Sequence, residues 1–144
     1  SITGLADLAK PGVRIVSETA EVPVRKYTEQ MLNKTLESGD YGQEFVDAFR
    51  ANVISEETNV ASATAKVALG EADAGITYYS DVTKDLADKI TIIEIPDEFN
   101  IVATYVAGIL TESTNKELAQ EYINLLTSEE GKAVLEEYNF APAN

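Results

Sequence analysis

Three hydroxyl side chains stand next to one another near the middle of the chain, in the segment GEADAGITYYSD (70–81). Tyr78, Tyr79 and Ser80 come directly after a short apolar run that is typical of a strand. The sequence contains no His and no Cys, which excludes the common zinc sites, thiolate metal sites and His-based catalysis. Without a His base, these hydroxyl groups offer hydrogen bonds to a ligand rather than nucleophilic chemistry.

Two pairs of adjacent carboxylates are the other source of chemistry in the sequence. Glu56-Glu57 and Glu129-Glu130 could in principle act as acid and base. Adjacent carboxylates at exposed helix ends are nearly always solvated, however, and no nucleophile motif accompanies either pair. We therefore expect a binding protein and not an enzyme.

The composition limits the partners of the chain. Its 144 residues suffice for one domain with a hydrophobic core. The 11 basic and 25 acidic residues give a net charge of −14, whereas nucleic acids and anionic membranes attract clustered Lys and Arg, so neither partner is expected. No apolar run is long enough to span a membrane and no signal peptide is visible. The opening SITGLADLAKPG reads like the interior of a longer chain.

Alternating strand and helix patterns in the sequence determine where Tyr78, Tyr79 and Ser80 lie. Strands are predicted for VRIVS (13–17), NVIS (52–55), GITY (75–78), KITIIEI (89–95) and IVATYVAGIL (101–110). Helices are predicted from Pro23 to Ser38-Gly39, after the polar SETAE (17–21), over 44–51, and over 59–72 with Thr58 or Asn59 as the cap. Further helices are predicted over 80–88, over 116–128 with a Thr114/Glu117 capping box, and around Val134, Leu135 and Tyr138. This order predicts an α/β fold with a mixed, largely parallel sheet flanked by helices.

Several motifs resemble the periplasmic solute-binding proteins for molybdate and tungstate, which belong to the type II solute-binding family of ABC transporters. GEADAGITYYSD (70–81) is similar to a segment that these proteins carry late in their second lobe. The other motifs follow the order of the family, namely LADLAKPGVRI (5–15), VPVRKY (22–27), ETNVASA (57–63) and EYINLLTSEEGKAVLEEYNFAP (121–142). The resemblance therefore extends over nearly the whole chain.

The resemblance implies an oxyanion site made of neutral donors. Val24 and Val60 would each donate a backbone N–H from the start of a helix, and Tyr78 would donate its phenol hydroxyl. Helix starts have unpaired N–H groups and a positive dipole end, so they bind anions even on an acidic protein. Arg25 and Ser80 are secondary candidates, with Ser80 starting the next helix and Tyr79 packing.

The ligand class follows from the same resemblance. A donor-only site suits a fully deprotonated dianion such as molybdate, tungstate or sulfate, whereas phosphate near neutral pH carries a proton that needs an acceptor. Where the family usually has small residues after VP, this chain has Val24-Arg25-Lys26, which leaves the choice of ligand open. The alternative ligands for the same fold are sulfate, phosphate, a polyamine and an amino acid. An alternative role for the chain is that of an effector-binding domain of a regulator. The resemblance implies no cofactor.

The resemblance also implies a division of the chain. Residues 1–10 would be a crossover segment, residues 11–97 the second lobe, and residues 98–144 a return strand with the C-terminal helices. The resemblance implies that the first lobe is missing, so we expect weak ligand binding and self-association through the surface that the lobe would cover. An extracytoplasmic protein, periplasmic or a cell-surface lipoprotein, would deliver its ligand to an ABC transporter permease.

Overall fold

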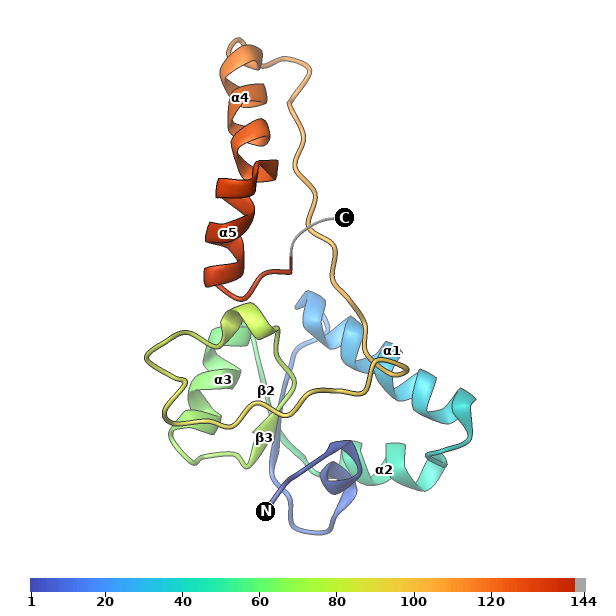
Figure 1. Ribbon diagram of the computed structural model, residues 1–144. Helices are drawn as coiled ribbons and strands as arrows, with labels where there is room; N and C mark the ends of the chain where they lie inside the picture. The colour runs from blue at the N-terminus through green and yellow to red at the C-terminus, as the bar shows by residue number, and fades with distance from the viewer. Residues whose placement is uncertain (142–144) are drawn as a thin grey trace. The chain divides into compact units, whose positions relative to one another are not determined.

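The computed structural model describes residues 1–141 and has the predicted α/β fold. The chain divides into two compact units, Ser1–Ile101 and Val102–Asn144, which Figure 1 shows in blue to yellow and in orange to red. Each unit is described by itself. The predicted functional residues all belong to the first unit.

A three-stranded parallel sheet forms the centre of the first unit. Its strands are β1 (Ile15–Glu18), β2 (Val53–Glu57) and β3 (Ala74–Gly75), in the order β2-β1-β3. Parallel neighbours require crossover connections, and the helices between the strands supply them. The central strand β1 is buried along its whole length, as expected for a strand covered on both faces.

Helices cover both faces of this sheet, as Figure 1 shows. Successive strand residues point to opposite faces. Ile15 accordingly packs with residues of α1 (Pro23–Ser38) and α2 (Gln43–Ala51), while Val16 packs with residues of α3 (Val60–Ala68). All three helices were predicted from the sequence and are confirmed.

The third strand is shorter than predicted. Only Ala74 and Gly75 pair with β1, and residues 76–78 have no regular structure. A Cβ atom at Gly75 would lie 3.1 Å from the Cγ1 of Val16, so glycine permits the close approach of the two strands. The predicted helix over 80–88 is wrong, because only the 3-10 helix η2 (Tyr79–Asp81) and isolated turns occur there. A segment this short does not recover the cost of helix nucleation unless packing supports it.

Two further predicted strands are wrong. Residues 89–95 and 101–110 form no strand, and among the described residues neither segment pairs with a strand. Apolar β-branched residues favour a strand only when a neighbouring strand satisfies the backbone N–H and C=O groups. The chain between the two segments is nevertheless anchored, since Phe99 is buried in the core and Lys34 Nζ donates to the backbone oxygen of Asn100 at 2.8 Å.

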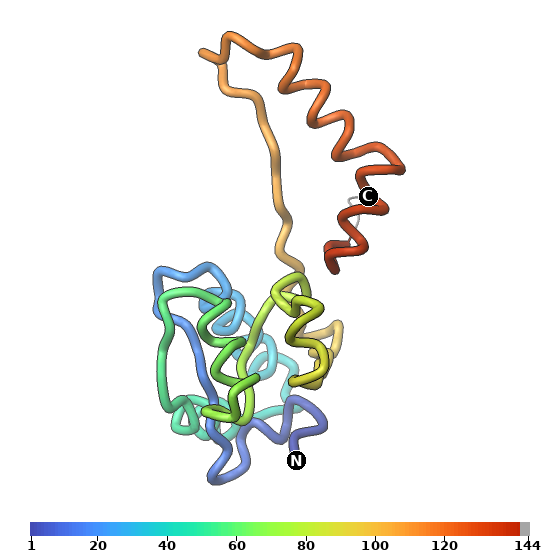
Figure 2. The backbone as a smooth tube through the Cα atoms, turned by 90° about the vertical axis from the view of Figure 1, so that its left-hand side faces the viewer, coloured from blue at the N-terminus to red at the C-terminus, as the bar shows by residue number. Residues whose placement is uncertain are grey.

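The second unit contains an extended segment followed by two helices, as the tube in Figure 2 shows. These helices are α4 (Lys116–Thr127) and α5 (Glu129–Glu137), and both were predicted. The predicted Thr114/Glu117 capping box is wrong, because the residue before α4 is Asn115 and no side chain caps it. No helix in residues 1–141 has the length and apolar character of a membrane span.

Candidate functional site

The carboxyl ends of three parallel strands meet at one edge of the sheet, where open α/β sheets bind ligands. The chain after β1 leads into α1, and the chain after β2 leads into α3. The chain after β3 leads to Tyr78. The three segments that carry the predicted donors therefore start from the same edge.

The first donor lies in the opening turn of α1. Pro23 occupies the start of the helix, where its missing N–H costs nothing, and Val22 precedes it in an extended conformation. The Val24 side chain is 2% exposed and belongs to the core. Its backbone N–H lies in the first turn, where no helix carbonyl is available to accept it. The packing role and the donor role of Val24 are thus compatible.

The second donor lies at the start of α3. Asn59 caps this helix, as predicted, because its side-chain oxygen accepts from the backbone N–H of Ser62 at 2.8 Å. The cap satisfies one first-turn donor and leaves those of Val60 and Ala61 without an intrahelical acceptor. Val60 is partly buried, and its carbonyl accepts from the hydroxyl of Thr64 at 3.0 Å.

Tyr78 and the residue before it contact α1 and α3 respectively. Its ring meets that of Tyr27, on α1, edge to face with a centroid distance of 6.2 Å. The residue before it, Thr77, has its hydroxyl 3.3 Å from that of Thr64 on α3. The ring of Tyr78 therefore lies against α1, and the segment that carries Tyr78 lies beside α3. Tyr79, which was expected to pack, is 53% exposed instead.

Ser80, the weaker hydroxyl candidate, is partly buried inside η2. The sequence predicted that it begins a helix, whereas the residue before η2 is Tyr78. Tyr78 and Ser80 thus belong to the same turn after β3. No group of three or more Asp or Glu side chains within residues 1–141 is arranged to hold a metal ion.

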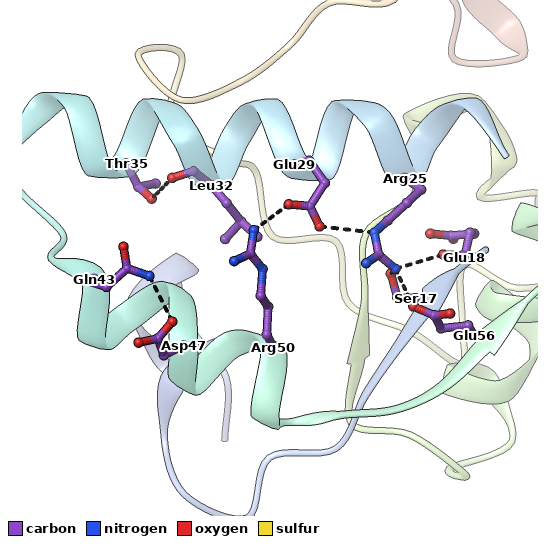
Figure 3. A network of polar contacts seen from close by, with 10 residues as sticks. All are labelled: Ser17, Glu18, Arg25, Glu29, Leu32, Thr35, Gln43, Asp47, Arg50 and Glu56. Carbon is purple, nitrogen blue, oxygen red and sulfur yellow. Dashed lines mark hydrogen bonds and ion pairs between the residues drawn. The ribbon is translucent and has the colours of Figure 1, made fainter. Parts of the chain in front are cut away.

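The guanidinium of Arg25 is held by the protein itself, as Figure 3 shows. It pairs with Glu29 at 3.1 Å and with Glu56 at 2.5 Å, and it donates to the backbone oxygen of Glu18 at 3.0 Å. Glu29 also pairs with Arg50 at 2.6 Å. Although burial raises the pKa of Glu29, Arg50 and Arg25 together hold that pKa below its usual value. The charge of Arg25 is therefore largely balanced by two carboxylates.

Glu18, at the end of β1, is a buried carboxyl group that the sequence analysis did not single out. Its side chain is 0% exposed, and no other described residue forms a hydrogen bond with either carboxyl oxygen. Burial raises the pKa of Glu18 to about 7; the positive charge of Arg25 opposes this rise and the negative charge of Asp81 adds to it. Within the polar run SETAE, no local signal distinguishes this glutamate from a solvated one.

A groove of about 1110 Å³ in the first unit lies elsewhere. Residues of the first thirteen positions, of α3 and of the stretch 72–100 line it. Thr64, Thr77 and Tyr79 border it, but none of the five predicted site residues does. A tetrahedral oxyanion is small and requires converging donors rather than a deep groove, so the helix starts remain the candidate site.

Comparison with known proteins agrees with this architecture. Residues 1–141 match the family model described as bacterial extracellular solute-binding protein. The molybdate-binding protein ModA of Mycobacterium tuberculosis (strain ATCC 25618 / H37Rv) is 29% identical over 140 residues, which cover 97% of this chain and 49% of that protein. The chain thus spans about half the length of the curated relatives that it matches.

Solved structures give the same result. A substrate binding domain of a molybdenum ABC transporter from Clostridium difficile has a TM-score of 0.78 and 26% identity, covering 100% of this chain and 59% of that one. L-phospholactate-bound PEB3 has a TM-score of 0.76 and 27% identity, covering 99% and 60%. The resemblance to molybdate-binding proteins of ABC transporters is therefore confirmed, and the chain belongs to the family of bacterial extracellular solute-binding proteins.

Proposed function

We propose that this chain is part of an extracytoplasmic solute-binding protein that captures a tetrahedral oxyanion, molybdate or tungstate, for uptake by an ABC transporter. The observation that carries the proposal is that the segments leading to α1, to α3 and to Tyr78 all leave the same edge of a parallel sheet, with the Tyr78 ring against α1. Val24 and Val60 supply backbone N–H groups, and Tyr78 supplies a hydroxyl. The ABC transporter permease is the protein partner in this proposal.

Neutral donors suit this protein better than a cationic pocket does. The positive dipole ends of α1 and α3 attract an anion in spite of the net charge of −14. Arg25, in the first turn of α1, already pairs with Glu29 and Glu56, so it contributes little uncompensated charge. Arg25 and Ser80 therefore remain secondary ligands in this proposal.

Relatives of twice this length carry the same fold segment, so we expect the chain by itself to supply one part of the donor set and to bind weakly. Backbone amide signals detect such binding. An NMR titration of the ¹⁵N-labelled chain with molybdate, with sulfate, and with chloride at equal ionic strength tests the proposal. Molybdate should shift amides at 24–26, 59–61 and 78–81. Sulfate should shift the same amides, and chloride should shift none of them.

The same titration tests the alternatives. A polyamine such as spermidine would contact carboxylates, so spermidine shifts at the three segments together with no molybdate shifts would favour the polyamine hypothesis. The absence of localised shifts with both oxyanions would contradict the oxyanion proposal.

A further inference from the structure

We propose that Glu18 is a ligand of the oxyanion site in its neutral form, donating its carboxyl O–H to the bound dianion, so that the anion and one proton bind together. This inference rests on the proposed function and names a chemical requirement of the same site. None of the five site residues predicted from the sequence is a carboxylic acid that could bring this proton.

The position of Glu18 is the first argument. It is the last residue of the central strand β1, and five residues later the chain starts α1. The carboxyl group interacts electrostatically with Arg25, in the first turn of α1, and with Asp81, in η2. Glu18 therefore lies near the first turn of α1, where Arg25 donates to its backbone oxygen, and within electrostatic range of η2.

The missing hydrogen-bond partners are the second argument. Figure 3 shows that Arg25 donates to the backbone oxygen of Glu18 and not to its carboxyl group. Buried polar side chains nearly always have partners, and an unsatisfied one costs about 1–3 kcal/mol. A neutral carboxylic acid has an O–H that requires an acceptor, and a dianion offers nothing but acceptors. The ligand would thus supply the acceptor that no other described residue offers to this carboxyl group.

The surrounding charges favour the neutral acid once the anion is bound. From α1, Arg25 shares its charge with Glu29 and Glu56. From β2, Glu57 pairs with Lys66 at 2.5 Å, and from η2 Asp81 adds a negative charge whose own pKa is raised by burial. A bound dianion would repel an ionised Glu18 strongly at this depth.

The consequence is a dependence of affinity on pH. Glu18 titrates near neutral pH in the free protein, with a pKa of about 7. Above that pH, each bound anion must bring a proton to Glu18, so affinity should fall roughly tenfold per pH unit. A donor set of backbone N–H groups and a tyrosine hydroxyl alone would give no such fall until the tyrosine itself ionises near pH 10.

Sulfate is the appropriate probe, because it stays a dianion across the whole range. The amide titration is run between about pH 6 and about pH 9 at constant ionic strength with three proteins: the wild-type chain, Glu18→Gln and Glu21→Gln. Glutamine at 18 keeps the shape and a donor but cannot titrate. Glu21→Gln removes the same charge from an exposed position before α1, so it controls for the loss of net charge.

We expect wild type and Glu21→Gln to lose at least about 30-fold in sulfate affinity across the upper part of this range, which corresponds to about 1.5 pH units at tenfold per unit. The affinity of Glu18→Gln should not change with pH. Site-localised binding with a flat wild-type profile, or an unchanged slope in Glu18→Gln, would overturn the Glu18 inference alone. The absence of localised binding in all three proteins at every pH would overturn the oxyanion proposal and this inference with it.

The ¹³C signal of the Glu18 carboxyl group in the wild-type chain provides a second readout that needs no variant. Its titration midpoint should move to higher pH when sulfate is present. A midpoint that sulfate leaves unchanged while the amides at 24–26, 59–61 and 78–81 shift would also overturn the inference.

Discussion

The rings of Tyr27 and Tyr78 meet edge to face, with their centroids 6.2 Å apart and their planes inclined by 71°. Such aromatic pairs contribute about 0.5–1.5 kcal/mol beyond the area they bury. Tyr27 lies one turn after the start of α1, so the pair fixes the segment after β3 against the helix that offers the Val24 N–H. In the proposed site, Tyr78 would therefore be positioned before any ligand arrives, which lowers the cost of binding.

Replacing Tyr78 with Phe should weaken oxyanion binding about tenfold or more, because a hydrogen bond to a charged partner contributes about 1.5–3 kcal/mol. The ring and its contact with Tyr27 remain, so the fold should persist. The affinity is measured by amide titration with molybdate. Tyr79→Phe is the matched control, since Tyr79 is 53% exposed and its hydroxyl is not assigned to the site. Equal losses in both variants would contradict the assignment of Tyr78.

Substitutions at Asn59 should separate helix capping from anion binding. Asn59→Ala removes the acceptor for the Ser62 N–H and should lower the free energy of unfolding by about 1 kcal/mol. Asn59→Asp keeps an acceptor but places a negative charge at the start of α3, so it should retain stability and lose anion affinity. Urea denaturation and amide titration measure the two effects. Full anion affinity in Asn59→Asp would contradict a site at this helix start.

The buried Glu18 should make stability depend on pH. Its pKa is about 7 in the folded state against an ordinary value of 4.5, so the folded state binds the extra proton between these values. The contribution of Glu18 to stability is therefore greatest below about pH 4.5 and declines as pH rises to about 7, by on the order of 3 kcal/mol.

Glu18→Gln should remove this decline. The free energy of unfolding of wild type relative to Glu18→Gln should thus fall as the pH is raised from about 5 to about 8 in urea denaturation series. The free energy of unfolding of wild type relative to Glu21→Gln should stay constant over this range, because hydrogen bonds from its own backbone and from Thr19 lower the pKa of Glu21. Parallel pH profiles for wild type and Glu18→Gln would contradict an ionisable group buried at this position.

Arg25→Lys should reduce stability more than it reduces anion affinity. Lysine keeps the charge but cannot bond Glu29, Glu56 and the backbone oxygen of Glu18 at once, as the guanidinium does. These contacts are partly solvated, so we expect a loss of about 1 kcal/mol in the free energy of unfolding. An affinity loss larger than that of Tyr78→Phe, with stability unchanged, would instead identify Arg25 as a direct ligand.

Much of the first unit could be predicted from the sequence. Pro23 marks the start of α1 and Gly39 its end, where a φ of 79° suits glycine, and Asn59 is a typical helix cap. Local chemistry determines these boundaries, so a single sequence suffices to find them. The three donor positions depended on the family resemblance.

The errors share a different cause. Residues 89–95 and 101–110 are as rich in β-branched residues as true strands, but pairing depends on a neighbouring strand that local sequence does not specify. Glu18 was missed for a related reason, because its burial results from α1, η2 and the sheet together and not from SETAE itself. Non-local contacts, rather than local propensity, decide whether these segments pair as strands and whether Glu18 is buried.

The most direct test of the oxyanion site is a crystal of this chain soaked in tungstate, with anomalous diffraction data collected at a tungsten absorption edge. The site proposed here predicts one dominant peak within hydrogen-bonding reach, through the tungstate oxygens, of the Val24 and Val60 backbone nitrogens and of the Tyr78 hydroxyl. A dominant peak elsewhere on the first unit, for example in the groove along residues 89–97, would contradict it.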